Sequence, residues 1–169
     1  HEVAAGIAAE YFNEASSGTQ KAFALVTAGP GLTNIVTSLA GAYLESRELL
    51  VLGGQVKSTD LATGGLRQRG IQEIDGVSIA SPVSKCSLRI EQPVDRATFT
   101  EAVLSGLSDR PGPVFLEFCL DAQGAIALLD DEKMIPLLHP KPMKVADAKG
   151  SILNFAECRQ PCVALTRHN

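Results

Sequence analysis

A turn with two glycines, Gly29 and Gly31, is the stretch of this sequence whose residue types and spacing could bind another molecule. Glycine permits backbone conformations that are closed to other residues, and it lets another molecule approach the main chain. Between the glycines, Pro30 fixes one dihedral angle and has no N–H to donate. The simpler interpretation is an ordinary tight turn between a strand and a helix.

The pattern of apolar residues predicts the elements that must position these groups. Val3, Ile7 and Tyr11 recur at helical spacing, and the run from 49 to 52 is apolar throughout, as in a buried parallel strand. Strands that alternate with helices indicate an α/β fold, a parallel sheet flanked by helices on both faces. The glycine turn then joins a strand to a helix, where open sheets of this kind bind ligands. We expect helices at 2–15, 32–46, 76–80, 93–107 and 146–157, and strands at 21–27, 48–53, 84–90, 113–118 and 161–165.

Composition and charge argue against several classes of protein. The chain has 169 residues, of which 45% are hydrophobic and 20% charged, which is typical of a globular domain. Its net charge of -4 and the lack of a basic patch with interleaved aromatic residues argue against nucleic acid as a partner. No apolar run is long enough to cross a bilayer, so we expect no membrane partner. The chain starts at His1 rather than Met, and we expect it to be part of a longer protein.

The cysteines bear on the compartment and on metal binding. Cys86, Cys119, Cys158 and Cys162 are scattered, which suits free thiols in a reducing compartment better than a disulfide framework. We therefore expect a cytoplasmic protein. His168 lies near two of the cysteines, but no second cysteine pair completes a zinc pattern, so we expect no metal site in this chain.

Several motifs follow one another in a definite order along the chain. They are HE at 1–2, TAGPG at 27–31, LLVLGGQV at 49–56, QEID at 72–75 and RPGPV at 110–114. In this order they resemble the pyrimidine-binding domain of thiamine-diphosphate enzymes, and most closely the acetolactate-synthase-like group. The resemblance implies a pyrimidine-binding domain at 1–123 that is truncated at its start. A linker at 124–145, rich in proline and acidic residues, and the start of a middle domain at 146–169 would follow.

The resemblance also implies roles for single residues. By its position before the alanine-rich helix, Glu2 matches the glutamate that hydrogen-bonds N1′ of the aminopyrimidine in this family. That contact favours the imino tautomer, whose 4′ nitrogen takes the proton from C2 of the thiazolium ring. The cofactor-binding residues implied in the loop against the pyrimidine ring are Thr27, Gly29, Pro30, Gly31 and Asn34. A carboxyl group suits the contact with N1′ because burial can raise its pKa and let it share a proton with a ring nitrogen. The simpler alternative for Glu2 is a first-turn glutamate beside the helix dipole. For Asn34, capping of the following helix is an equal alternative.

A second segment of the resemblance lies in the long polar loop from 54 to 74. Gln72 falls where the family carries a glutamine at the active-site edge. Many acetolactate-synthase-like sequences have a phenylalanine before it that lines the substrate passage, whereas this chain has Ile71. That departure leaves the acceptor preference open. Two acidic residues here, Glu73 and Asp75, either form a subunit contact or face solvent.

The parent enzyme implied by the resemblance would use thiamine diphosphate, with Mg²⁺ bound through a separate C-terminal domain that has a Gly-Asp-Gly sequence. This chain has no Gly-Asp-Gly, so we expect it to supply only the aminopyrimidine-binding half-site and to be inactive alone. The parent enzyme would decarboxylate a 2-keto acid such as pyruvate and transfer the carbanion to an acceptor. In the family the site forms between two subunits, so a second copy is an expected partner, and Ala40, Gly41 and Ala42 would permit its close approach. These residues leave open whether FAD also binds.

Two other classes of protein fit parts of the pattern. A nucleotide-binding module could use the glycines at 29–31 and 53–54 to cradle phosphates, but the chain has neither G-x-G-x-x-G nor G-x-x-x-x-G-K-[ST]. A non-catalytic interaction or regulatory domain could keep the fold without the chemistry, although Glu2 argues against that alternative.

Overall fold

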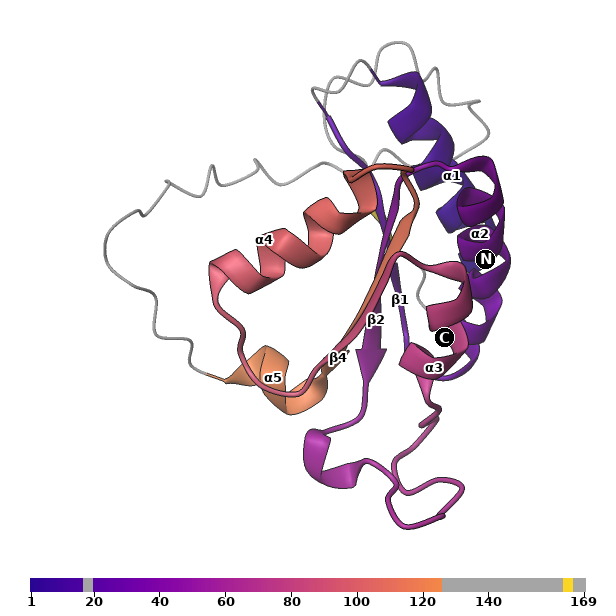
Figure 1. The fold of residues 1–169 in the computed structure, drawn as a ribbon. Coiled ribbons are helices and arrows are strands. Elements are labelled where there is room, and N and C mark those ends of the chain that lie inside the picture. Colours follow the sequence, from indigo (N-terminus) through magenta and orange to yellow (C-terminus); the bar gives the residue numbers. More distant parts are fainter. Residues whose placement is uncertain (17–19, 126–162, 166–169) are drawn as a thin grey trace, which may run out of the picture.

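The computed structural model describes residues 1–16, 20–125 and 163–165, which fold around a parallel sheet. Its strands lie in the order β3-β4-β2-β1-β5, and every pairing is parallel (Figure 1). Parallel neighbours cannot be joined by a tight hairpin, so the chain between them crosses over through helices. The strands are β1 Phe23–Val26, β2 Leu49–Gln55, β3 Cys86–Ile90, β4 Pro113–Cys119 and β5 Val163–Leu165.

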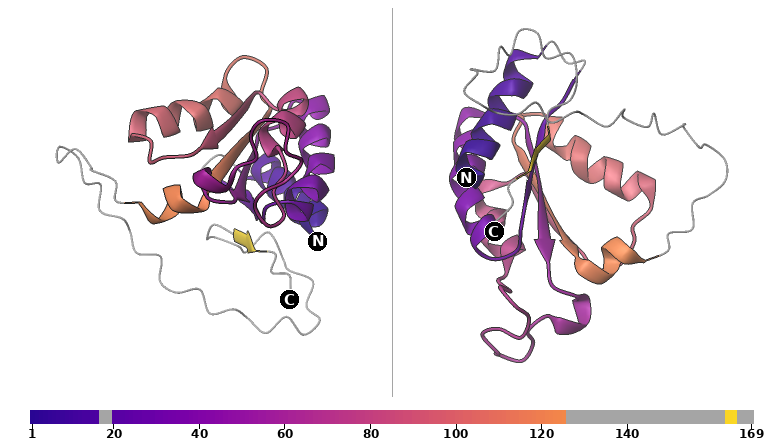
Figure 2. Two further views of the ribbon diagram at one scale, coloured as in Figure 1. Left: turned by 90° about the horizontal axis from the view of Figure 1, so that it is seen from below. Right: turned by 180° about the vertical axis from the view of Figure 1, so that it is seen from behind.

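Helices cover both faces of this sheet, as the α/β pattern predicts (Figures 1 and 2). On one face, α1 (Glu2–Ala15) and α2 (Pro30–Glu45) pack together with the short α3 (Gly76–Ala80). On the opposite face lie α4 (Arg96–Leu104) and the short α5 (Leu120–Gly124). Short 3-10 helices complete the described elements at Ser58–Asp60, Ser81–Val83 and Ser105–Leu107.

β2 lies between β4 and β1 and contributes side chains to both hydrophobic clusters of the core. Its residues alternate between buried and half-buried, because successive side chains point to opposite faces. Val51 joins the hydrophobic cluster with Leu32 and Phe115 on the α1–α3 side. Leu52 packs against the cluster with Leu116 on the α4 side. Both faces of the strand are therefore apolar, as its sequence predicts.

The buried face of α1 is not the apolar stripe that indicated the helix. Gly6 and Ala9 face the interior, and a Cβ on Gly6 would come 2.5 Å from the Cβ of Ser38 on α2. Ile7 and Tyr11 are instead 42% and 55% exposed. Small residues thus let α1 and α2 approach closely, while the larger apolar side chains stay at the surface.

Two helix starts differ from the expected ones for local reasons. The helix expected at 32–46 begins already at Pro30, whose fixed φ suits the first helical position. The helix expected at 93–107 begins only at Arg96, because the Asp95 side chain accepts a hydrogen bond from a backbone N–H of the first turn and caps it.

The last expected elements fall largely outside the described residues. This holds for the helix at 146–157 and for Cys158 and Cys162. The strand expected at 161–165 is found as β5, which pairs in parallel with β1. The domain boundaries after 123 and 145 stay predictions.

Two further expectations concern thiols and membranes. Cys86 and Cys119 are free cysteines, and Cys119 is buried. Burial raises the pKa of the Cys119 thiol to about 11, so this group is an unreactive core thiol at neutral pH. Among the helices in the described part of the chain, none is long and apolar enough to cross a membrane.

Candidate functional site

The glycine turn connects the carboxyl end of β1 to the first turn of α2. Gly29 is the residue before α2, and its φ of 64° lies in the left-handed region that side chains disfavour. A Cβ at this position would also lie 2.6 Å from the backbone oxygen of Gln72. Glycine is therefore required twice, by the conformation of the turn and by the segment packed on it. Pro30, the first residue of α2, is exposed.

Glu2 is buried at the start of α1 and is tied to the first turns of α2. His1 caps the helix, accepting a hydrogen bond from the backbone of Val3, and Glu2 is only 1% exposed. Its Oε2 accepts a hydrogen bond of 3.1 Å from Nδ2 of Asn34, and Nδ1 of His1 lies 3.8 Å away. The Asn34 amide thus donates to the glutamate, and α2 has no side-chain cap hydrogen bond.

Gly31 lies close to both Thr27 and Glu2. A Cβ on Gly31 would lie 2.5 Å from Oγ1 of Thr27 and 3.6 Å from Oε1 of Glu2. The turn therefore keeps its backbone bare beside a buried carboxylate, with an amide and a hydroxyl next to it. The ring nitrogen of an aminopyrimidine accepts a hydrogen bond and its amino group donates one. A protonated carboxyl group could donate to the ring nitrogen, and a carbonyl or hydroxyl oxygen could accept from the amino group.

The two residues expected at the active-site edge have different positions. Gln72 meets the turn through its contact with Gly29 and has a φ of 59°, unusual for a residue other than glycine. Ile71 is 87% exposed. The structure thus brings Gln72 to the turn and leaves Ile71 at the surface.

Glu73 organises the loop that carries Gln72. Its carboxylate accepts hydrogen bonds from the backbone N–H groups of Ala62, Arg69 and Gly70. These bonds, that from Ala62 foremost, hold the pKa of Glu73 below its ordinary value. The carboxylate of Glu73 is thus used inside the loop, and a subunit contact and a solvent-facing side chain both stay predictions for this half-buried residue.

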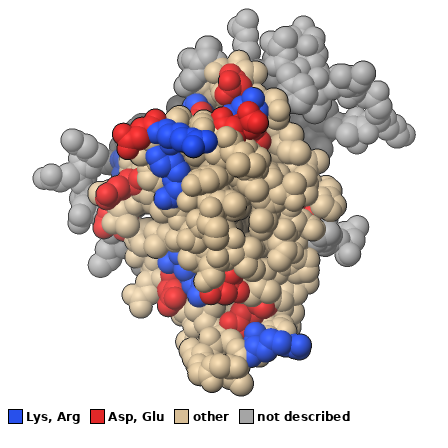
Figure 3. Space-filling model, turned by 45° about the vertical axis from the view of Figure 1, so that its right-hand side comes forward, with Lys and Arg blue, Asp and Glu red and all other residues tan. Residues whose placement is uncertain are grey.

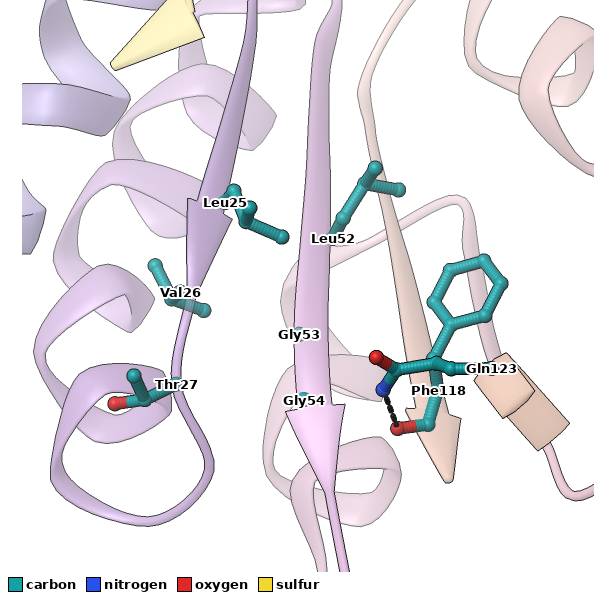
Figure 4. A pocket seen from close by; sticks show the side chains of 8 residues that line it. All are labelled: Leu25, Val26, Thr27, Leu52, Gly53, Gly54, Phe118 and Gln123. Carbon is teal, nitrogen blue, oxygen red and sulfur yellow. Dashed lines mark hydrogen bonds between the residues drawn. The ribbon is translucent and has the colours of Figure 1, made fainter. Parts of the chain in front are cut away.

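A pocket of about 390 Å³ lies near the turn, at the carboxyl ends of β1, β2 and β4 (Figure 4). Leu25, Leu52 and Phe118 form its apolar wall, and the Gln123 side chain donates to the backbone oxygen of Phe118 at 3.1 Å. Thr27 also lines it, alone among the candidate site residues. The pocket is therefore a neighbour of the turn and not the place where the candidate residues meet.

One buried polar cluster next to the site was missed by the sequence analysis. Glu117, on β4, is fully buried and accepts hydrogen bonds from Nε of Arg89 at 2.6 Å and Nε2 of Gln55 at 3.1 Å. Burial raises the pKa of Glu117, although Arg89 opposes that rise. Asp75 joins the cluster through Arg89 and caps α3. The signal in the sequence was a single acidic residue inside the apolar strand PVFLEFC.

Metal binding is not supported by the described part of the chain. No group of three or more His, Cys, Asp or Glu side chains is placed there to hold an ion. Cys158, Cys162 and His168 lie outside the described residues.

Comparison with known proteins agrees with the resemblance. Residues 1–79 match the family described as thiamine pyrophosphate enzyme, N-terminal TPP binding domain. The probable acetolactate synthase large subunit of Methanocaldococcus jannaschii is 34% identical over 86% of this chain and 22% of that protein. The acetolactate synthase isozyme 3 large subunit of Escherichia coli is 35% identical over 72% of the chain and 19% of that protein.

A relative that is named for a different activity aligns over almost the whole chain. The oxalyl-CoA decarboxylase of Escherichia coli is 31% identical over 98% of this chain and 29% of that protein. The chain thus spans less than a third of each of these three relatives. From the family match, the relatives and the fold, we conclude that the chain belongs to the thiamine pyrophosphate enzymes and is similar to their acetolactate synthases.

Proposed function

We propose that the full-length protein decarboxylates a 2-keto acid such as pyruvate and transfers the resulting carbanion to an acceptor. In this proposal the chain supplies the half-site that binds the aminopyrimidine of thiamine diphosphate. The observation that carries it is the buried Glu2, held by Asn34 directly beside the bare turn at Gly31. When bound, the cofactor supplies the electron sink that decarboxylation of a 2-keto acid requires.

Each residue of the turn has a task in this proposal. Glu2 holds a proton at N1′ of the pyrimidine, and Asn34 orients the carboxylate by donating to Oε2. Gly29, Pro30 and Gly31 present a bare and rigid backbone to the ring edge, with Thr27 at its border. Gln72 lies at the edge of the site because its backbone packs on the turn. The exposed Ile71 would line the substrate passage, in place of the phenylalanine of the acetolactate-synthase-like sequences.

Binding of the rest of the cofactor is assigned to parts of the protein outside this chain. Mg²⁺ and the diphosphate would be held by a separate domain. FAD remains an open second cofactor. The free thiols of Cys86 and Cys119 fit a cytoplasmic protein.

We also propose a second copy of the chain as a partner, packed against the outer side of α1 and α2. Figure 3 shows a broad uncharged surface on the side that carries these helices, with charged residues gathered mainly toward its two ends. A Cβ on Gly41 would meet nothing within 4 Å, and Tyr43 and Leu44 are 41% and 74% exposed. Ala42 is fully buried and serves the core, so the contact would use its exposed neighbours. Sedimentation that finds a catalytically active monomer would contradict this proposal.

Titration of the full-length protein with thiamine diphosphate tests the proposed function against its two alternatives. In the presence of Mg²⁺, we expect saturable binding of thiamine diphosphate and no comparable binding of ATP or NAD. Binding of a nucleotide alone would favour the nucleotide module. Binding of neither compound would favour an interaction domain that kept the fold without the chemistry.

A further inference from the structure

The cluster of Gln55, Asp75, Arg89 and Glu117 has no task in the proposed chemistry, yet it adjoins the segment that carries Gln72. Gln55, Arg89 and Glu117 come from three neighbouring strands, β2, β3 and β4. Their side chains meet on the α3 side of the sheet, where a Cβ on Gly76 would overlap the Glu117 carboxylate. A fully buried carboxylate therefore lies directly against the first residue of α3.

We propose that Glu117 is a positioning residue that fixes the segment 70–76, and through it the turn at Gly29. The inference deepens the proposed function, because that turn is the one assigned to the aminopyrimidine. Two arms lead from Glu117 to the segment, one through Gln55 and one through Arg89.

The first arm runs through a side-chain amide. Nε2 of Gln55 donates to Glu117 at 3.1 Å and to the backbone oxygen of Ile74 at 2.8 Å. Its Oε1 accepts from the backbone N–H of Val56 at 2.9 Å, so every polar atom of this side chain has a partner. Because Glu117 takes one of the two amide hydrogens, it fixes the rotation that aims the other at Ile74.

The second arm runs through a guanidinium. Arg89 donates through Nε to Glu117 at 2.6 Å and through a terminal nitrogen to Asp75 at 2.9 Å. Asp75 in turn caps α3 by accepting from the backbone N–H of Ser78 at 3.2 Å. The planar fork of arginine joins the two carboxylates in one geometry, which a lysine would not reproduce.

The backbone of the segment 70–76 has a conformation that depends on these hydrogen bonds. Gln72 has a left-handed backbone conformation, which costs free energy in a residue other than glycine and persists only where the surroundings impose it. Its backbone oxygen is the atom that a Cβ on Gly29 would approach to 2.6 Å. A shift of the segment 70–76 would therefore change the packing behind the turn.

Stability alone is a weak reason for such a cluster. A buried ion pair often stabilises a protein no more than apolar residues of the same volume would, because both charges lose their hydration. Burial raises the pKa of Glu117, which agrees with that cost. Holding a strained segment in a single position is a task that directional hydrogen bonds perform and apolar contacts do not.

The test is Glu117→Gln in the full-length protein, with Glu10→Gln as a matched control. Gln is nearly isosteric with Glu, but its amide nitrogen must face one of two donors. We expect the Kd for thiamine diphosphate to rise about tenfold, a loss near 1.4 kcal/mol. Amide hydrogen exchange in 70–76 should accelerate. Glu10 is also buried, at 4% exposure, and pairs with Arg47 at 3.1 Å, but it belongs to α1 and not to the cluster around Glu117. Its variant should leave both measurements at the wild-type values.

The possible results separate the inference from the proposed function. Unchanged affinity and exchange in Glu117→Gln overturn the inference, as do equal changes in both variants, which would indicate general destabilisation. If the wild-type protein does not bind thiamine diphosphate, the proposed function fails, and faster exchange confined to 70–76 still supports the positioning role. If Glu117→Gln does not fold, Arg89→Lys takes its place, since it keeps the charge and loses the fork. The same two measurements then decide.

Discussion

Two buried glutamates, Glu2 and Glu117, are 1% and 0% exposed and have different partners. Glu2 begins a helix and accepts a hydrogen bond from the neutral amide of Asn34, beside a turn with a bare backbone. Glu117 lies within a strand and accepts from the guanidinium of Arg89 as well as from an amide. Burial raises the pKa of Glu117, and Arg89 opposes that rise. In the proposed function Glu2 exchanges a proton with a ligand, whereas Glu117 holds the segment 70–76 in place.

The largest effect is expected for Glu2, the glutamate to which the proposed function gives the acid–base role. Glu2→Gln keeps the shape of the side chain and removes its acid–base function, so kcat of the full-length protein should fall by about 10²–10⁴-fold. The KM for the 2-keto acid should change much less, because the lost interaction belongs to the chemical step. Steady-state kinetics at saturating thiamine diphosphate give both values. Glu14→Gln, on the same helix and with a side chain that is 61% exposed, is the control that should keep wild-type kinetics.

Breaking the ion pair between Arg89 and Glu117 should lower the stability of the fold. Arg89→Met leaves the buried Glu117 without its cation, and we expect the free energy of unfolding to fall by about 3 kcal/mol. Adding Glu117→Leu removes the uncompensated charge and should recover most of that loss. Denaturant unfolding of both variants measures this. A double variant that is less stable than Arg89→Met would show that the pair itself, rather than an orphaned charge, determines the loss.

The turn beside Glu2 should tolerate a methyl group less well than a helix of the same domain. Gly29→Ala places a Cβ against the backbone of Gln72 at a positive φ, so we expect a loss of about 1–3 kcal/mol. Gly124→Ala lies at the end of α5 with open space around it, and we expect no loss and a gain of up to about 1 kcal/mol. Thermal unfolding compares the two. Equal effects would mean that the packing of the turn on Gln72 is not required.

The smallest effect is a loosening of the Gln72 loop in acid. Because hydrogen bonds lower the pKa of Glu73, its contribution to loop stability is fully present above the ordinary value of 4.5. That contribution is lost as the pH falls from 4.5 through the lowered pKa. Asp75 and Asp121 are shifted in the same direction by serine hydrogen bonds, so a pH profile alone does not isolate Glu73. Hydrogen exchange in 57–74, corrected for its intrinsic pH dependence, should therefore be compared with Glu73→Gln, which should already be loose at neutral pH.

The sequence predicted local features of the site better than long-range ones. The helix starting at Glu2 and the strand–turn–helix around Gly29 are found, because periodicity and glycine spacing act over a few residues. The pairing of Glu2 with Asn34 joins residues 32 positions apart, and only the packing of α1 on α2 creates it. The expected cofactor-binding roles stay predictions, since geometry places the residues together without a ligand.

The sequence did not reveal which face of α1 is buried or which side chain pairs with Glu117. Ile7 and Tyr11 indicated a helix but not the face it buries, because close packing against α2 selects small residues instead. Glu117 was overlooked within an apolar strand, although a lone charge in such a strand needs a buried partner. That partner, Arg89, lies on a different strand, and strand order is not encoded in local pattern.

The most direct test of the central claim is hydrogen–deuterium exchange at C2 of thiamine diphosphate bound to the full-length protein. Wild type and Glu2→Gln would be compared at cofactor saturation, so that weaker binding does not enter the result. If Glu2 acts on the aminopyrimidine, the exchange rate should fall by about 10²-fold or more in the variant. Equal rates would contradict the account, and Glu2 would then be only a buried helix-start glutamate.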